Sequence, residues 1–111
     1  MKLWIDDVRP SPSGYRWARS VYEAKVIIRN YETMLKASGG KVRYQIELID
    51  IDHDAGDYAF DGGDYIRLLD WLEWLYDGHG TNIKFHIHSM NPVGVENMRR
   101  IIQRNGWTEV I

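Results

Sequence analysis

The sequence predicts one α/β domain built on a mainly parallel sheet, and three observations lead to this prediction. The chain has 111 residues, which is enough for one hydrophobic core. It is 44% hydrophobic and 27% charged, as globular proteins are and disordered chains are not. Short apolar runs alternate with amphipathic segments of helix length, an order typical of parallel strands joined by right-handed crossovers. We therefore expect residues 1–111 to form a single domain.

The first half of the chain predicts three strands and one helix. Ser20 and Glu23 have the S-x-x-E spacing of a capping box, which predicts that a helix starts there. The glycine pair at 39–40 predicts its end. In order, we expect a strand at residues 2–6, a Pro- and Gly-containing loop at 8–14, a short strand at 15–18, the helix, and a strand at 44–52.

The second half predicts two further helices and two further strands. Asn91 and Pro92 favour a helix start, because Asn caps the first turn and Pro fits the first helical position. Gly106 predicts the end of that helix. In order, we expect a helix at residues 64–77, a strand at 82–88, a helix from 91 to about 105, and a strand at 107–111.

Polar side chains follow three of the predicted strands. Ligands of parallel α/β sheets bind beyond the carboxyl ends of the strands, and these ends share one edge. We therefore expect the polar side chains to lie close together at this edge, which we call the rim. The rim residues are Asp6 and Asp7 after the first strand, Asp52, His53 and Asp54 after the strand at 44–52, and His88, Ser89 and Asn91 after the strand at 82–88.

Asp6, Asp7 and Asp52 are the predicted ligands of a metal ion. Carboxylates held close repel one another unless a proton or a cation lies between them. Clusters made only of oxygen ligands suit Mg²⁺ or Mn²⁺ better than zinc, so we predict one of these two ions as the cofactor. The alternative is that these acids cap loops and helices, as aspartates at strand-to-helix turns commonly do.

His53 and His88 are predicted to act as general base and general acid at the rim, with Asp54 as a third candidate catalytic residue. The alternative for each histidine is a purely structural hydrogen bond. His86 lies two residues before His88. We expect it to face the packed side of the sheet, opposite His88, and to have a structural role.

Arg9, Ser89 and Asn91 are predicted to bind a phosphate group. A guanidinium and a hydroxyl both donate hydrogen bonds to phosphate oxygens, and the helix that starts at Asn91 points its N-terminal amides at the rim. Two alternatives remain open. Arg9 can pair with a nearby carboxylate, and Ser89 can bond the backbone of its own turn.

Composition and charge exclude several classes of function. The chain has no cysteine, so it has neither a disulfide framework nor a thiolate zinc site, and a reducing compartment is expected. Acids at positions 6 and 7 come too early for a signal peptide, and no apolar run reaches membrane-spanning length. The net charge of -2 gives no general attraction for polynucleotides. We expect a cytoplasmic protein with no membrane and no long nucleic acid as partner.

Three stretches of the sequence resemble a known family, the cyclic-phosphate processing receiver-like domains, which are similar to the receiver domains of response regulators. The stretches are Leu3-Trp4-Ile5-Asp6-Asp7-Val8-Arg9-Pro10, Ile51-Asp52-His53-Asp54-Ala55-Gly56 and His88-Ser89-Met90-Asn91-Pro92-Val93-Gly94-Val95-Glu96-Asn97-Met98. The resemblance implies a receiver-like (flavodoxin-like) three-layer sandwich with a mainly parallel sheet of four or five strands. It also implies a role in processing cyclic-phosphate compounds, and it adds Asn97 to the predicted substrate-binding residues.

The chain departs from ordinary receivers in two places. Too few residues separate the first strand from Tyr15 for a crossover helix, so the first receiver helix is predicted to be missing. Residues 107–111 lack the lysine that receivers carry at the end of their last strand, so phosphotransfer signalling is not expected.

Together, these observations predict a metal-assisted phosphoesterase-like domain that processes or binds a small cyclic-phosphate compound, such as a cyclic nucleotide or a cyclic-ended RNA. The predicted enzyme would be an Mg²⁺- or Mn²⁺-dependent phosphodiesterase. Two alternatives stay open: a non-catalytic module that binds a nucleotide or phosphate, and a receiver-derived module that binds another protein.

Overall fold

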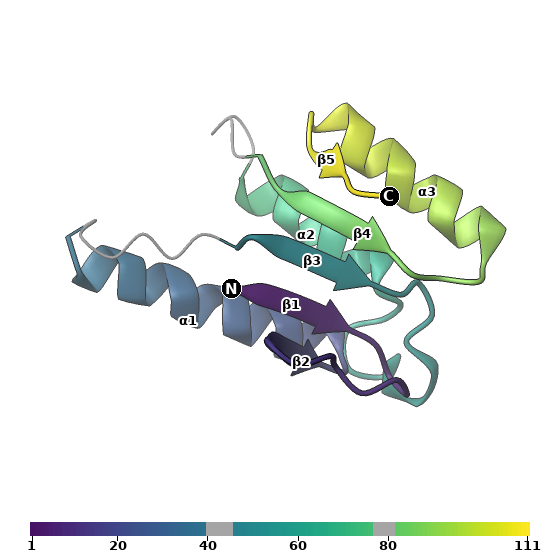
Figure 1. The fold of residues 1–111 in the computed structure, drawn as a ribbon, viewed down its shortest axis with the longest axis horizontal. Coiled ribbons are helices and arrows are strands. Elements are labelled where there is room, and N and C mark those ends of the chain that lie inside the picture. Colours follow the sequence, from purple (N-terminus) through teal and green to yellow (C-terminus); the bar gives the residue numbers. More distant parts are fainter. Residues whose placement is uncertain (40–45, 77–81) are drawn as a thin grey trace.

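The structure is a computed structural model that describes residues 1–39, 46–76 and 82–111, apart from the side chain of Leu35. Its elements are, in order, β1 (Lys2–Ile5), β2 (Tyr15–Ala18), α1 (Val21–Ala37), β3 (Leu48–Ile51), a short 3-10 helix η1 (Gly56–Tyr58), α2 (Ile66–Leu75), β4 (Lys84–Ile87), α3 (Pro92–Arg104) and β5 (Thr108–Glu109). The strands form one five-stranded sheet in the order β2-β1-β3-β4-β5, with every pair parallel (Figure 1).

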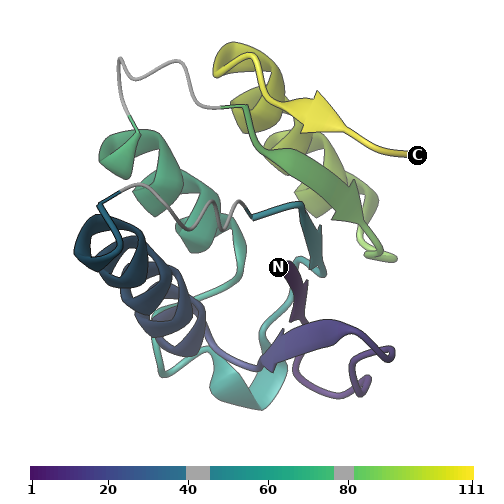
Figure 2. The same cartoon turned by 60° about the vertical axis from the view of Figure 1, so that its left-hand side comes forward.

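The helices α1, α2 and α3 all lie on one face of the sheet (Figures 1 and 2). The connections β2 to β3, β3 to β4 and β4 to β5 run in the same direction across the sheet, so right-handed crossovers place their helices on the same face. α2 contacts both α1 and α3, and the three helices therefore form one layer. The connection from β1 to β2 runs the other way, and residues 6–14 contain no helix.

The predicted α/β class, the parallel sheet and the missing first helix are confirmed, but the predicted third layer is wrong for the described residues. A helix between β1 and β2 would cover the second face of the sheet, and a loop takes its place. The described residues therefore form two layers. We call the side of the sheet that no described helix covers the open face.

The hydrophobic core lies between the sheet and the helix layer. Leu3, Ile5, Ile49, Ile51 and Phe85 point from the strands toward the helices and are fully buried. They pack against the apolar faces of the helices, whose fully buried residues are Val21, Ala24, Ile28, Leu68, Leu69, Leu72 and Met98. Successive side chains of a strand point to opposite faces, so the residues between these core positions lie on the open face.

Two of the helices begin where their capping residues predict. The Ser20 hydroxyl accepts a hydrogen bond from the N–H of Glu23 at 3.0 Å, and the Glu23 carboxylate accepts one from the N–H of Arg19 at 2.7 Å. Asn91 caps α3, with its side-chain oxygen accepting from the N–H of Gly94 at 3.0 Å. These bonds satisfy amide groups that have no partner within the helix.

The other boundaries differ from the prediction by a few residues. α2 begins at Ile66 rather than 64, because the Asp64 carboxylate accepts a hydrogen bond from the N–H of Ala55 at 3.1 Å and belongs to the preceding loop. Among the described residues, β3 begins only at Leu48; residues 44–45 and 77, which were predicted in a strand and a helix, lie outside the described residues. No helix of the described ranges combines the length and apolar character needed to cross a bilayer.

Candidate functional site

The rim lies at the carboxyl ends of β1, β3 and β4, which are neighbours in the sheet. Asp6 and Asp7 follow β1, and Asp52 follows β3. One oxygen of each of these three carboxylates lies within 4.8 Å of one oxygen of the others. The predicted acidic cluster is thus brought together, and its all-oxygen donor set is of the kind that hard divalent cations prefer.

The carboxylates of Asp6 and Asp7 differ in how their charge is stabilised. Burial, followed by the charges of Asp6 and Asp52, raises the pKa of Asp7. Burial acts in the same direction on Asp6, but hydrogen bonds from the N–H groups of Arg9 and Val8 and from His88 outweigh it and lower the pKa of that carboxyl. Of these two carboxyls, Asp7 is therefore the one whose negative charge is disfavoured by its surroundings.

Asp6 also shapes the loop that carries Arg9. Its Oδ1 accepts hydrogen bonds from the N–H groups of Val8 at 2.9 Å and Arg9 at 2.8 Å. The indole of Trp4 donates to the carbonyl of Arg9 at 2.9 Å, and that of Trp17 donates to the carbonyl of Asp6 at 2.8 Å. This loop therefore has a fixed path over the end of the sheet, and it places Arg9 at the rim.

His88 lies between two buried carboxylates. Its Nε2 is 2.9 Å from Oδ2 of Asp6, and its Nδ1 is 2.6 Å from Oδ1 of Asp50. An ionised carboxylate can only accept, so with Asp6 and Asp50 ionised both ring nitrogens donate and the ring is an imidazolium. Burial opposes that charge, but the bonds to Asp50 and Asp6 outweigh burial and raise the pKa of His88. The ring of Trp4 stacks on it, with centroids 4.1 Å apart and planes at 5°.

The prediction that His86 faces the packed side of the sheet is wrong. Its Nδ1 is 2.8 Å from Oδ1 of Asp50, the same oxygen that His88 contacts. Residues two apart in a strand point to the same face, so His86 and His88 both lie on the open face. Asp50 pairs with His86 in the register of β3 and β4.

Asp50 was not among the predicted site residues. Burial raises its pKa, but the hydrogen bonds from His88 and His86 outweigh burial, so the pKa of Asp50 is lowered overall. The signal that could have identified it is an acid between the two apolar residues Ile49 and Ile51 of a buried strand. Such an acid is not tolerated without partners.

His53 lies on the other side of the rim, beside the start of α3. Its Nδ1 is 2.8 Å from Oδ1 of Asp54, and this bond is the largest cause of the lowered pKa of Asp54. The amide nitrogen of Asn91 donates to the same oxygen at 3.4 Å. The ring lies so close to Gly94 that a Cβ there would overlap it, so the missing side chain of Gly94 makes room for His53.

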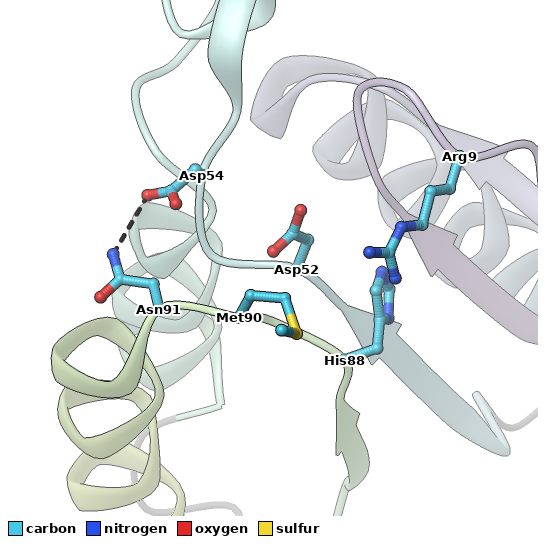
Figure 3. A pocket seen from close by; sticks show the side chains of 6 residues that line it. All are labelled: Arg9, Asp52, Asp54, His88, Met90 and Asn91. Atoms are coloured by element: carbon cyan, nitrogen blue, oxygen red, sulfur yellow. Dashed lines mark hydrogen bonds between the residues drawn. The ribbon is translucent and has the colours of Figure 1, made fainter.

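A pocket of ≈ 240 Å³ opens between these two sides of the rim (Figure 3). Asp52 lies in the middle of the view, with Arg9 and His88 on one side and Asp54 and Asn91 on the other. Met90, which was not predicted, also lines it. The guanidinium of Arg9 is exposed and pairs with no described residue, so the predicted alternative of a local ion pair is not seen.

The remaining predicted residues lie elsewhere. The Ser89 hydroxyl accepts a hydrogen bond from the N–H of Asn91 at 3.1 Å, which is the structural alternative for this side chain. Asn97 is exposed in α3, and the described lining of the pocket includes neither it nor Ser89 nor His53. A position at the end of a strand, or for Asn97 the family resemblance, therefore did not suffice to identify residues that line the pocket.

Comparisons with known proteins add one finding. A search of curated proteins and a search of solved structures gave no significant match. A scan against protein families matched residues 1–104 to the cyclic-phosphate processing receiver domain. That match spans nearly the whole chain, including the three stretches that form the rim. With its α/β receiver-like fold and its rim of aspartates, this chain belongs to the cyclic-phosphate processing receiver domain family.

Proposed function

We propose that the rim binds Mg²⁺ or Mn²⁺ through Asp6, Asp7 and Asp52 and hydrolyses a small cyclic-phosphate compound. The observation that carries this proposal is the gathering of the three carboxylates within 4.8 Å next to a pocket that also receives the unpaired guanidinium of Arg9. A cation and an arginine on one pocket suit a phosphate ester. The family to which the chain belongs supports the cyclic phosphate as substrate class.

The donor set fits the proposed cation. The charge of Asp7 lacks compensation, and a divalent cation would supply it. When bound, the ion would neutralise negative charge that develops on the phosphate. Arg9, whose loop is held by Asp6, lines the same pocket and would bind a phosphate oxygen there.

The geometry changes the roles proposed for the two histidines. Both ring nitrogens of His88 already bond to carboxylates, so His88 has no lone pair with which to accept a proton. We assign it a positioning role: it holds Asp6 in place and offsets part of the charge of the cluster. His53 does not line the pocket, but it contacts Asp54, and Asp54 does line the pocket.

The reaction would be the addition of water to a cyclic phosphodiester. The water oxygen bonds to phosphorus, one ring P–O bond breaks, and the proton that the water loses is taken up, overall, by the leaving oxygen. Since the pKa of Asp54 is lowered, this carboxylate is a weak base, and its proposed role is to orient the attacking water. Asn91 also donates a hydrogen bond to Asp54, at 3.4 Å (Figure 3).

A second candidate function is a module that binds the same ligand without turnover. The observation that favours it is that neither histidine offers a free nitrogen to the pocket: His88 is bonded at both nitrogens, and His53 does not line it. A site in which no histidine accepts a proton can bind a phosphate through Arg9 and the cation without turnover.

One experiment distinguishes the two functions. Purified protein is incubated with Mg²⁺ or Mn²⁺ and a panel of cyclic mononucleotides, cyclic dinucleotides and cyclic-ended oligonucleotides, and products are separated by chromatography. We expect turnover that stops with a chelator and that Asp52→Asn lowers by about 100-fold or more, because a catalytic cation contributes several kcal/mol. Asp70→Asn, an exposed acid of α2, is the matched control and should keep full activity.

Saturable, metal-dependent binding without turnover would select the binding module. If no compound of the panel were turned over or bound, both functions would be contradicted. Equal turnover in Asp52→Asn and Asp70→Asn would remove the acidic cluster from the reaction.

A further inference from the structure

We propose that Asp50, His86 and His88 form a second metal site, for Zn²⁺, on the open face of the sheet. We call these three residues the face site. It shares no residue with the acidic cluster of Asp6, Asp7 and Asp52. Its donors are two imidazoles and one carboxylate, a set that favours zinc over the hard cations that all-oxygen sites bind.

The distances within the face site are close to those that a zinc ion requires. Oδ1 of Asp50 is 2.8 Å from Nδ1 of His86 and 2.6 Å from Nδ1 of His88, and the three residues each offer one ligand atom within 4.8 Å of the others. In a tetrahedral site with bonds of about 2.0–2.1 Å, ligand atoms are about 3.3 Å apart. Each histidine nitrogen therefore needs to move away from Oδ1 of Asp50 by less than about 1 Å to reach this separation.

The surroundings of His88 match those of a metal-ligating histidine. Such a histidine usually donates its second ring N–H to a carboxylate, which fixes the ring and its tautomer. Here Nε2 of His88 is 2.9 Å from Oδ2 of Asp6, while Nδ1 points at the face site. The stacked ring of Trp4 holds the same imidazole from its flat side. Zinc would replace only the proton on Nδ1, and the bond to Asp6 would remain.

The site is accessible because no described helix covers the open face. The side chain of Asp50 is 10% exposed and that of His88 is 9%, whereas that of His86 is 39% exposed. The two less exposed ligands are held by packing, and His86 is the one at the surface. Three protein ligands leave one coordination position of zinc free, and this position would face solvent.

The test is zinc binding by metal-free protein, measured by isothermal titration calorimetry. Wild type should bind one Zn²⁺ per chain with micromolar or tighter affinity. His86→Ala should raise the Kd by at least ~10-fold, because even outer-shell changes at metal sites weaken binding by that factor. His53→Ala is the matched control and should leave the Kd unchanged, since His53 lies on the other side of the rim. Circular dichroism of each variant checks that it is folded.

A second readout reports on the ligand atom. Long-range ¹H–¹⁵N spectra of the histidines should show Nδ1 of His88 losing its proton when zinc is added while Nε2 keeps its own. No zinc binding by wild type, or equal affinity of wild type and His86→Ala, would contradict the proposal. Loss of binding in His53→Ala would place the zinc elsewhere and contradict it too. The rise in melting temperature with Mg²⁺ should persist in His86→Ala. Zinc binding at the face site and Mg²⁺ binding at the rim are therefore tested independently.

Discussion

The two faces of the sheet are built from alternate residues of the same strands, and in the middle of the sheet they differ in chemistry. In β3, Ile49 and Ile51 are fully buried under the helix layer, whereas Asp50 between them bonds to His86 and His88 on the open face. The covered face is stabilised by exclusion of water from apolar groups, and the open face by pairing of charges. The missing crossover helix therefore leaves room for a polar network in the middle of a parallel sheet.

The largest expected loss of stability follows from a substitution on the open face. His88→Ala leaves the carboxylates of Asp6 and Asp50 without their shared cation, and removing one partner of a buried ion pair costs about 3–5 kcal/mol. We expect the free energy of unfolding, measured with urea, to fall by that amount. A fall below about 0.5 kcal/mol would mean that the open face behaves as ordinary surface.

The same network predicts a pH dependence. The folded-state pKa of His88 is raised above its ordinary value of 6.5, so its contribution is complete below about pH 6.5 and is lost as the pH rises through the raised value. The pKa values of Asp6 and Asp50 are lowered from 3.8, so their contributions are present above that pH and are lost in acid. Two further charged or titratable residues lie beside this network: Arg9, which lines the same pocket as His88, and His86, which bonds to Asp50.

Urea unfolding at about pH 6 and about pH 9 measures the alkaline side of this dependence. Wild type should lose more stability than His88→Gln between the two values, since the variant has no proton to lose at this position. Parallel pH profiles of the two proteins would show that His88 is not held as a cation.

The next prediction compares the loss of stability on substituting two neighbouring residues that lie on opposite faces of the sheet. Ile49→Ala creates a cavity under the helix layer and should cost about 2–5 kcal/mol of unfolding free energy. Leu48→Ala removes a partly exposed side chain of the open face and should cost less than half as much. Urea unfolding of both variants checks the difference. Equal losses would mean that the open face is covered in solution.

A smaller effect concerns the contact between α3 and His53. Alanine is favoured over glycine in a helix by about 1 kcal/mol, but a Cβ at position 94 would overlap the His53 ring, and overpacking costs about 1–3 kcal/mol. We expect Gly94→Ala to destabilise wild type and to stabilise the His53→Ala protein. A double-mutant cycle by thermal unfolding measures this reversal. The same sign in both backgrounds would show that His53 does not rest on Gly94.

The features of the fold and of the site that could be predicted from the sequence depend on local patterns. The caps formed by Ser20 and Asn91 are bonds between residues three apart, and the aspartates that end β1 and β3 follow short apolar runs. The parallel order of the strands places these ends together without further information. The fold class and the acidic cluster therefore needed only local pattern and topology.

The parts that could not be predicted depend on contacts between distant residues. Asp50 and His86 belong to the site because of the register between β3 and β4, which no local pattern states. The two bonds of His88 span 38 and 82 residues of sequence separation. Strand-end position suggested Ser89 and His53, and the family resemblance suggested Asn97, but none of the three is among the described residues that line the pocket.

The smallest effect tests the central proposal most directly, namely that the rim binds a divalent cation. A ligand at tenfold excess over its Kd stabilises the native state by about 1.4 kcal/mol, or roughly 6–10 °C in Tm for a domain of this size. Mg²⁺ or Mn²⁺ should raise the Tm of wild type and of the Asp70→Asn control by this amount, and NaCl at equal ionic strength should not. Asp52→Asn should keep or raise the metal-free Tm, because one repelling charge is gone, and should lose the response to metal. A Tm that responds equally to Mg²⁺ and NaCl in wild type, or a metal response that persists in Asp52→Asn, would contradict the account.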